Sequence, residues 1–217
     1  SCIDSTYTND GGAFVFDGGT LVAGGSSQRL IRRIGSVTIN SGKTAFIDTA
    51  GFYERVQSGM TGGGGLTKLG AGTLVLEGTN SYAGATLVST GAVLFAANQN
   101  LNAVTVSHGA VIGTDIDLPD NQAALDSLTM GSGSTNFFNL YSGDSSPTPA
   151  RMLLTNGLVL NGPVTVLVTS SEVLSSNTLY HLLDYGTGIS GSGSLALGPL
   201  PCGMVANLVT NGTVIGL

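Results

Sequence analysis

The sequence predicts an all-β protein, and within that class a parallel β-helix (β-solenoid). Short β-branched runs are separated by Gly and Asn, helical periodicity is almost absent, and strand-like runs return about every 18 residues. A chain that returns to the same face at such a period lays down stacked coils. A β-sandwich has turn signals every ~8–12 residues and no longer register. Antiparallel hairpin pairing is the competing arrangement.

The expected strands are four or five residues long and rich in Val, Leu, Ile and Thr. They are AFVF at 13–16, SVTI at 36–39, TLVL at 73–76, AVTV at 103–106 and VTVLV at 164–168. Turns are expected at the Asn-Gly pairs 156–157, 161–162 and 211–212, because both residues tolerate a left-handed backbone. One short helix is predicted over Asp120–Leu128.

Two interleaved strand series define the coil repeat. The first series begins at Thr73, Ala92, Ala110 and Ser127, and the second begins at Ala85 and Ala103. Both series advance together by about 18 residues per coil. At this period and ~4.8 Å between coils, the chain makes at most about 11 or 12 coils, a rod of roughly 45–55 Å. The residues expected to point inward are Leu74, Leu76, Val88, Leu94, Val104, Val106 and Val111.

The composition fits stacked coils. Charged residues make up 9% of the chain, whereas Gly, Ser, Thr and Asn together account for 95 of its 217 residues. In a β-helix each side chain stacks on its equivalent in the next coil, so a charge would meet a like charge, and small or hydroxyl side chains avoid that repulsion. Intrinsic disorder is excluded, because 41% of the residues are apolar.

Charge and hydropathy exclude two classes of partner. The formal net charge is −6, and both nucleic acid and an anionic membrane surface require a basic patch. No apolar run reaches the ~18 residues of a membrane helix, so no membrane insertion by this chain is expected. Residues 1–70 carry a net charge of +1 and residues 71–217 a net charge of −7. An elongated molecule would therefore have a nearly neutral end and an acidic remainder.

One segment carries a family resemblance. Residues 62–92 read GGGGLTKLGAGTLVLEGTNSYAGATLVSTGA. This resembles the autotransporter-associated β-strand repeat, with matches at Leu66, Thr67, Lys68, Gly70, Gly72, Thr73, Leu74, Leu76, Gly78, Asn80, Tyr82, Gly84, Thr86, Val88 and Gly91. Flanking segments also resemble the neighbours of this repeat, so the likeness extends over residues 11–217.

The resemblance implies a right-handed parallel β-helix, extracellular or on the cell surface of a diderm bacterium. A single domain is expected over 1–217, with an N-terminal extension at 1–12, the repeat at 62–92 and C-terminal coils at 150–217. Autotransporter chains end in an outer-membrane translocator, and residues 1–217 contain no such segment, so we expect either a passenger cut from a longer chain or a free-standing secreted β-helix. The resemblance therefore concerns the fold, and the secretion route stays open.

The acidic cluster Asp115, Asp117 and Asp120 is the best candidate for a metal or catalytic site. Hard oxygen ligands suit calcium, but the spacing matches neither an EF-hand loop nor the nonapeptide repeat of calcium-binding β-rolls. No basic residue lies between Lys68 and Arg151, so an anionic transition state would lack a counter-charge. We expect no metal, no cofactor and no catalytic residue, and interpret the cluster as a solvated acidic loop.

Other reactive side chains lack partners at useful spacing. His108 and His181 have no Cys or Glu nearby, although His181 can bond locally to Asp184. Ser145 has neither a His nor an Asp placed to activate it. The arginine-rich run 28–33 is interpreted as a solvated face, and the glycines at 62–65 lack the Lys-Ser/Thr ending of a phosphate-binding loop.

The two cysteines, Cys2 and Cys202, are far apart in the sequence and form no metal or redox motif. In a rod they fall toward opposite ends, whereas a disulfide requires Cα atoms within ~7 Å. Three states stay open at this stage. They are an intermolecular bond between stacked copies, an intrachain bond made by a returning N-terminal segment, and two free thiols.

The sequence thus predicts a non-enzymatic, extracellular structural β-helix. Neither end carries an obvious cap, so head-to-tail stacking of identical subunits into a filament is the expected assembly. The alternative is an adhesin-type passenger in which loops 114–126 and 141–151 bind a surface polysaccharide or a receptor.

Overall fold

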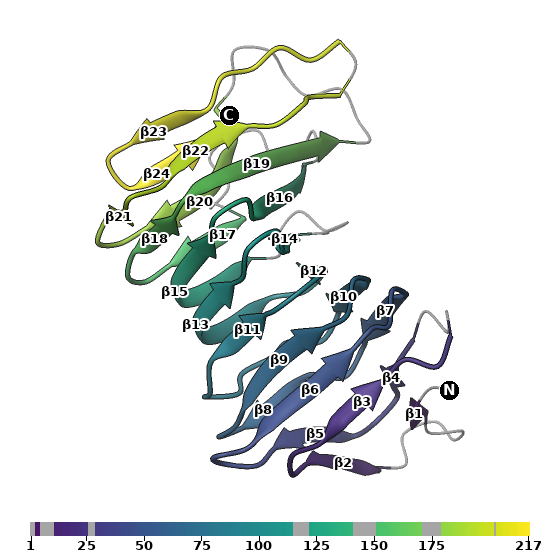
Figure 1. Ribbon diagram of the computed structural model, residues 1–217. Coiled ribbons are helices and arrows are strands. Elements are labelled where there is room, and N and C mark those ends of the chain that lie inside the picture. Colours follow the sequence, from purple (N-terminus) through teal and green to yellow (C-terminus); the bar gives the residue numbers. More distant parts are fainter. Residues whose placement is uncertain are drawn as a thin grey trace.

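A computed structural model of the chain describes residues 3–4, 11–25, 29–114, 122–140, 151–170, 179–201 and 203–217. These residues contain 24 strands and no helix, and therefore no helix that could span a membrane. The strands wind into a stack of coils that runs from the N-terminus at one end to the C-terminus at the other (Figure 1). The predicted all-β, parallel β-helical fold is confirmed.

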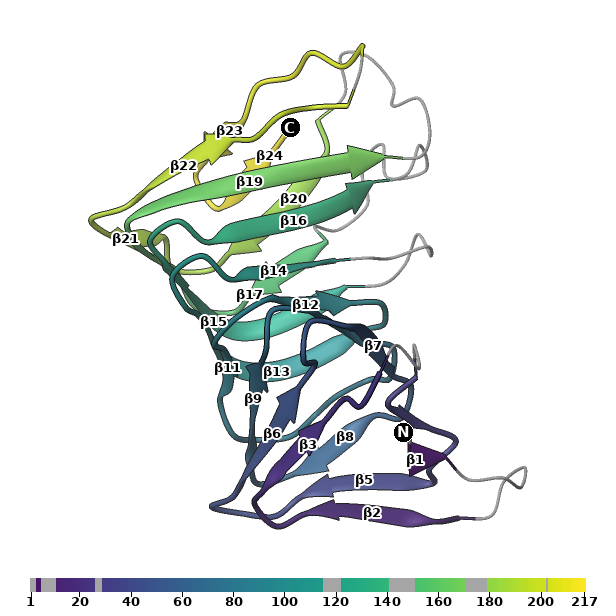
Figure 2. The same cartoon turned by 45° about the vertical axis from the view of Figure 1, so that its right-hand side comes forward.

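The first side of the coils is a nine-stranded parallel sheet. Figure 2 shows several of its strands one above another. In stacking order they are β1 (Ile3–Asp4), β4 (Ile31–Arg32), β7 (Tyr53–Val56), β10 (Thr73–Leu76), β12 (Ala92–Phe95), β14 (Val111–Thr114), β16 (Thr135–Leu140), β19 (Pro163–Ser170) and β22 (Ser194–Leu197).

The second and third sides begin as separate strands. The second side starts with β2 (Ala13–Phe16), β5 (Ser36–Ile39) and β8 (Met60–Gly62). It continues through backbone bonds such as Ala83 N to Gly62 O at 2.8 Å. The third side starts with β3 (Thr20–Val22), β6 (Thr44–Asp48), β9 (Gly65–Leu69) and β11 (Thr86–Val88).

Two long strands then join these sides. The first half of β13 (Gln99–Val106) and of β15 (Ala123–Gly131) lies on the second side, and the second half lies on the third. Beyond them the sides separate again, into β17 (Met152–Leu154) and β20 (His181–Tyr185) on the second side and β18 (Leu158–Asn161) and β21 (Ile189–Gly191) on the third.

The coil length varies more than the sequence predicts. Within the repeat segment the coils are short, and Thr73 pairs with Ala92, which pairs in turn with Val111. Toward the C-terminus each coil takes up much more of the chain, so that Thr135 pairs with Thr165 and Val164 with Leu195. Longer coils use up the chain faster, so the first side has nine strands. Nine strands lie within the predicted upper limit of about 11 or 12 coils.

The prediction of which residues point inward is correct on most of the strands concerned and wrong on two. Leu74, Leu76, Val88, Val104 and Val106 are buried as expected. On β12, Val93 and Phe95 are buried and Leu94 is not. On β14, Ile112 is buried, whereas Val111 is only half-buried. The pairing of Leu74 with Val93 fixes this register, and a shift of one residue turns every side chain to the opposite face.

The helix predicted over 120–128 is wrong, because residues 123–131 form β15. Leu125 and Leu128 both point inward on either side of a corner, and this spacing of three residues resembles a helical period. Ser127 begins a run on the third side, paired with Ala103, so it does not continue the series of Thr73, Ala92 and Ala110.

The third side has an uncharged outward column, as the low content of charged residues indicated. One outward column of the third side passes through eight coils in which each residue pairs with the next. It consists of Thr20, Phe46, Thr67, Leu87, Thr105, Thr129, Val159 and Ser190. Hydroxyl and apolar side chains therefore stack along the rod without like-charge repulsion.

The C-terminal end differs from the expected run of coils. After β22 the chain forms an antiparallel pair, β23 (Val209–Asn211) and β24 (Val214–Gly216), joined at Asn211-Gly212, and β24 pairs antiparallel with β20. Several side chains between β22 and β24 pack against the core, namely Leu200, Met204, Ala206 and Leu208. The core at this end is thus covered, although we expected no cap.

Candidate functional site

The main concentration of buried polar groups lies in the coils formed by residues 60–99. Lys68, at the end of β9, has no exposed surface. Its Nζ donates hydrogen bonds to three backbone carbonyl oxygens, those of Leu69 at 2.9 Å, Gly70 at 2.7 Å and Thr90 at 3.1 Å. Thr90 belongs to the next coil, so one side chain joins the corners of two successive coils.

The environment of Lys68 changes its protonation. Burial lowers the pKa of the ammonium group to about 8, and the charge of Asp48 opposes this shift. The carbonyls take the place of water around Nζ, and a buried amine is stable only when its donors are satisfied in this way. Lys68 is inaccessible to a substrate, so its role is to hold the corners together.

A second polar cluster links two coils through side-chain amides. Asn80 is fully buried, its Oδ1 accepts a bond from Met60 N at 2.8 Å, and its Nδ2 donates to Gly78 O at 2.8 Å. The same Nδ2 donates to Gln99 Oε1, one coil on, at 2.7 Å. Gln99 Nε2 donates in turn to Gly78 O and Ala97 O. Backbone groups that a tight corner leaves unpaired are satisfied here by side chains.

Tyr82 closes the same corner. Its ring is buried, and its hydroxyl lies 2.6 Å from Thr86 Oγ1, four residues along the chain. Burial raises the pKa of the Tyr82 hydroxyl, so the group stays neutral and acts only as a hydrogen-bonding partner. Lys68, Asn80, Tyr82 and Gln99 are called the corner staples below.

Glycines let the corners stack closely. A Cβ on Gly64 would lie 2.4 Å from Ile39 Cγ2 and 2.5 Å from Asn40 O, and a Cβ on Gly84 would lie 2.5 Å from Gly64 itself. Real Cβ atoms do not approach other atoms so closely. The glycine run 62–65 is therefore a packing requirement of adjacent coils.

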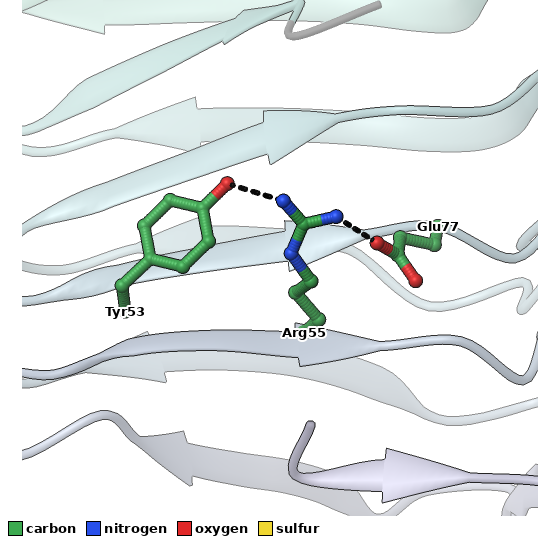
Figure 3. Close-up of polar contacts among 3 residues, drawn as sticks. All are labelled: Tyr53, Arg55 and Glu77. Atoms are coloured by element: carbon green, nitrogen blue, oxygen red, sulfur yellow. Dashed lines mark hydrogen bonds and ion pairs between the residues drawn. The ribbon is translucent and has the colours of Figure 1, made fainter. Parts of the chain in front are cut away.

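The outer face of the first side carries one charged cluster, drawn in Figure 3. Arg55 on β7 bonds to Glu77, just beyond β10, through Nη1 and Oε1. Its Nη2 donates to Tyr53 Oη at 3.3 Å, and the guanidinium lies 5.3 Å from the centre of the Tyr53 ring. The hydrogen bond with Glu77 raises the pKa of Arg55. The three side chains join adjacent coils and contain no nucleophile next to a base.

The acidic candidates Asp115, Asp117 and Asp120 lie outside the described residues. Asp126, the next acidic residue along the chain, accepts a hydrogen bond from Asn156 Nδ2 at 2.6 Å. Among the residues that the structure describes, no group of three or more His, Cys, Asp or Glu side chains is arranged to hold a metal ion.

The histidine predictions can be compared with the structure. His181 Nδ1 lies 3.9 Å from Asp184 Oδ1, within the range of an ion pair but too far for the hydrogen bond we expected. Burial raises the pKa of the Asp184 carboxyl, and His181 partly offsets the shift. His108 is exposed in a turn. Ser145, Cys2 and Cys202 lie outside the described part of the chain.

Sequence reasoning considered Lys68 only in the charge balance and as a match to the repeat, and its burial is the main feature that was missed. The signal was present, because Lys68 follows the inward Leu66 by two residues and alternation places both on the same face. Arg29 and Arg33 are exposed, as expected for a solvated face, and Arg32 is half-buried.

Residues 66–94 match a family model, the Passenger-associated-transport-repeat. The autotransporter-type repeat expected in this segment is confirmed. No curated protein matches the chain at a significant level. Three of the four corner staples, Lys68, Asn80 and Tyr82, lie within the repeat, and Gln99 follows it. The repeat therefore supplies the buried polar bonds between coils, and its presence implies a secreted or surface-exposed protein.

Proposed function

We propose that the chain is a non-enzymatic, structural β-helix on the surface of a diderm bacterium, or released from it, and that it assembles head to tail with copies of itself. The corner staples and the continuous core support the structural part of this proposal, because they make adjacent coils hold together as one rigid rod. Their polar groups bond to backbone, to one another or, for Tyr82, to the hydroxyl of Thr86, which leaves them unavailable for chemistry on a bound molecule.

The observation that carries the assembly part is the state of the two ends. Within the described residues, β1, β2 and β3 each pair with a strand on one edge only, and so do β21, β22 and β23 at the other end. Unpaired edges offer N–H and C=O groups to another chain. Contact between unlike ends is heterologous and does not close, so it produces filaments.

The test is direct observation of the purified chain. Negative-stain images and sedimentation should show filaments that grow with concentration, and single rods with the mass of one chain would contradict the proposal. Val15→Lys places a charge on the exposed edge strand β2, where Val15 is 50% exposed, and should shorten or abolish the filaments. Leu87→Lys, on an outer face in the middle of the rod, is the matched control and should leave them intact.

The adhesin-type alternative, binding to a polysaccharide or a receptor, depends mainly on loops 114–126 and 141–151, most of which lie outside the described residues. Binding of glycans by the monomer, with no tendency to form filaments, would favour it over the structural proposal.

A further inference from the structure

The direction of the last strand bears on how two copies can meet. All strands of the second side from β13 to β20 are parallel. β24 is antiparallel to β20, and β23 is antiparallel to β24. Two reversals restore the original direction, so the outermost strand at the C-terminal end runs the same way as the rest of its side.

The matching strand at the other end is β2. It is the first strand of the second side, it is parallel to β5, and no described strand pairs with its outer edge. The pairing places β2 and β23 on the same side, Figure 1 shows them at opposite ends of the stack, and both keep one edge unpaired within the described residues. A copy stacked on the rod without rotation brings β2 next to β23 in the parallel sense.

We infer that β23 of one copy pairs in parallel with β2 of the next, so that the second side continues from subunit to subunit. This rests on the head-to-tail function proposed above and names the strands that make the contact. The antiparallel pair at the C-terminal end then acts as an adaptor that covers the core while presenting a strand of the correct direction.

The faces of the two strands fix which residues align. Asn211 pairs with Val214, and Val214 pairs with Asp184, which lies on the same outward column as Leu153. Asn211 and Val209 therefore share the outward face, whereas Thr210, itself exposed, shares the face of its buried partner Ile215. On β2, Val15 is exposed and Phe16 is buried. Continuous pleating requires Asn211 and Val209 to lie on the same face as Val15.

Engineered cysteines test this alignment. In a Cys2→Ser/Cys202→Ser chain, Val15→Cys is combined with Asn211→Cys, on the same face, or with Thr210→Cys, on the opposite face. After mild oxidation the same-face pair should give a ladder of covalent multimers that collapses on reduction, because paired strands lie about 4.8 Å apart. The opposite-face pair should give at least several-fold less multimer.

The possible outcomes distinguish failure of the β23–β2 contact from failure of the proposed head-to-tail assembly. Equal cross-linking of both pairs, or none of either in material that forms filaments, would overturn the β23–β2 contact and leave head-to-tail assembly standing. Filaments from the unmodified chain but not from the Cys2→Ser/Cys202→Ser chain would assign the contact to the cysteines instead. Single rods under every condition would overturn the proposed function and the contact together.

Discussion

Asn80 and Gln99 occupy successive coils of the rod, and Asn80 Nδ2 donates a hydrogen bond of 2.7 Å to Gln99 Oε1. Both side chains are buried, and each also bonds to backbone groups of the corner. An amide suits this place because it donates and accepts without a charge. The pair thus joins two coils where the backbone alone leaves donors and acceptors unpaired.

Replacing Asn80 with alanine should destabilise the fold by about 3 kcal/mol, because Met60 N and Gln99 Oε1 lose their partner while still buried. Asn100→Ala, at an exposed position of the next coil, should change the free energy of unfolding by less than ~0.5 kcal/mol. Urea denaturation of the two variants gives the comparison, and equal losses would show that the Asn80 bonds contribute nothing specific.

Lys68 should give the stability a distinct pH dependence. Burial lowers its pKa from 10.5 to about 8, so between these values the unfolded chain keeps a proton that the folded chain has lost. The free energy of unfolding should therefore rise from pH 8 to pH 10. Above that range Tyr82 acts in the opposite direction, since burial raises its pKa and only the unfolded chain ionises.

The measurement is denaturation of the unmodified chain and of Lys68→Met at several values between pH 7.5 and 10. The unmodified chain should gain stability relative to Lys68→Met across this window. Lys43→Met serves as control, because the Lys43 side chain is 48% exposed and its loss should leave the slope unchanged. Parallel curves for the unmodified chain and Lys68→Met would refute the assignment.

The register of β12 predicts unequal effects for two neighbouring residues. Phe95 is fully buried, so Phe95→Ala should cost about 3–5 kcal/mol through lost burial and a cavity. Leu94 lies on the outer face, and Leu94→Ala should cost about 1 kcal/mol or less. A larger loss for Leu94→Ala would restore the register that the sequence alone indicated.

The glycines of the corners provide a steric test. Gly64→Ala places a methyl group against Ile39, Asn40 and Lys43 of the preceding coil, and should destabilise the chain by more than ~2 kcal/mol. Gly12→Ala adds the same methyl group where no atom lies within 4 Å, and should be close to neutral. Thermal melting of the two variants measures the difference, and similar melting temperatures would argue against close stacking at Gly64.

Periodicity was enough to predict the fold class, because equivalent strands of successive coils begin at a regular spacing in the sequence. Thr73 and Ala92 show this spacing on one side of the coils, and Ala85 and Ala103 show it on another. Periodicity alone did not show which residues of β12 point inward, since the run Ala92–Phe95 is apolar throughout. Only the pairing with Leu74 and Leu76 decides that register.

The corner staples were harder to predict than the core. Asn80, Tyr82 and Lys68 were visible as members of a repeat. Asn80 and Lys68 bond to backbone atoms of adjacent coils, Met60 N and Thr90 O, and Tyr82 bonds to the side chain of Thr86. Such contacts leave no pattern in the sequence. The antiparallel β23–β24 pair was missed for a related reason. Its residues are strand-forming, and the Asn211-Gly212 turn was seen, but the partner strand β20 lies far earlier in the chain.

The final prediction concerns Cys2 and Cys202, which lie outside the described residues. Their chain neighbours are described: Ile3 pairs with Ile31 at the N-terminal end, and Gly203 lies within the segment that covers the core at the C-terminal end. The nine strands of the first side, ~4.8 Å apart, separate these ends by roughly 38 Å. An intrachain disulfide requires Cα atoms within ~7 Å, which is far less than the separation of these two ends. Of the three states that the sequence left open, the intrachain bond is therefore disfavoured.

On non-reducing gels we expect either a ladder of multimers that collapses to one chain with reductant, or a single monomer band whose two thiols both react with an alkylating agent. A monomer band that resists alkylation until it is reduced would contradict this geometry.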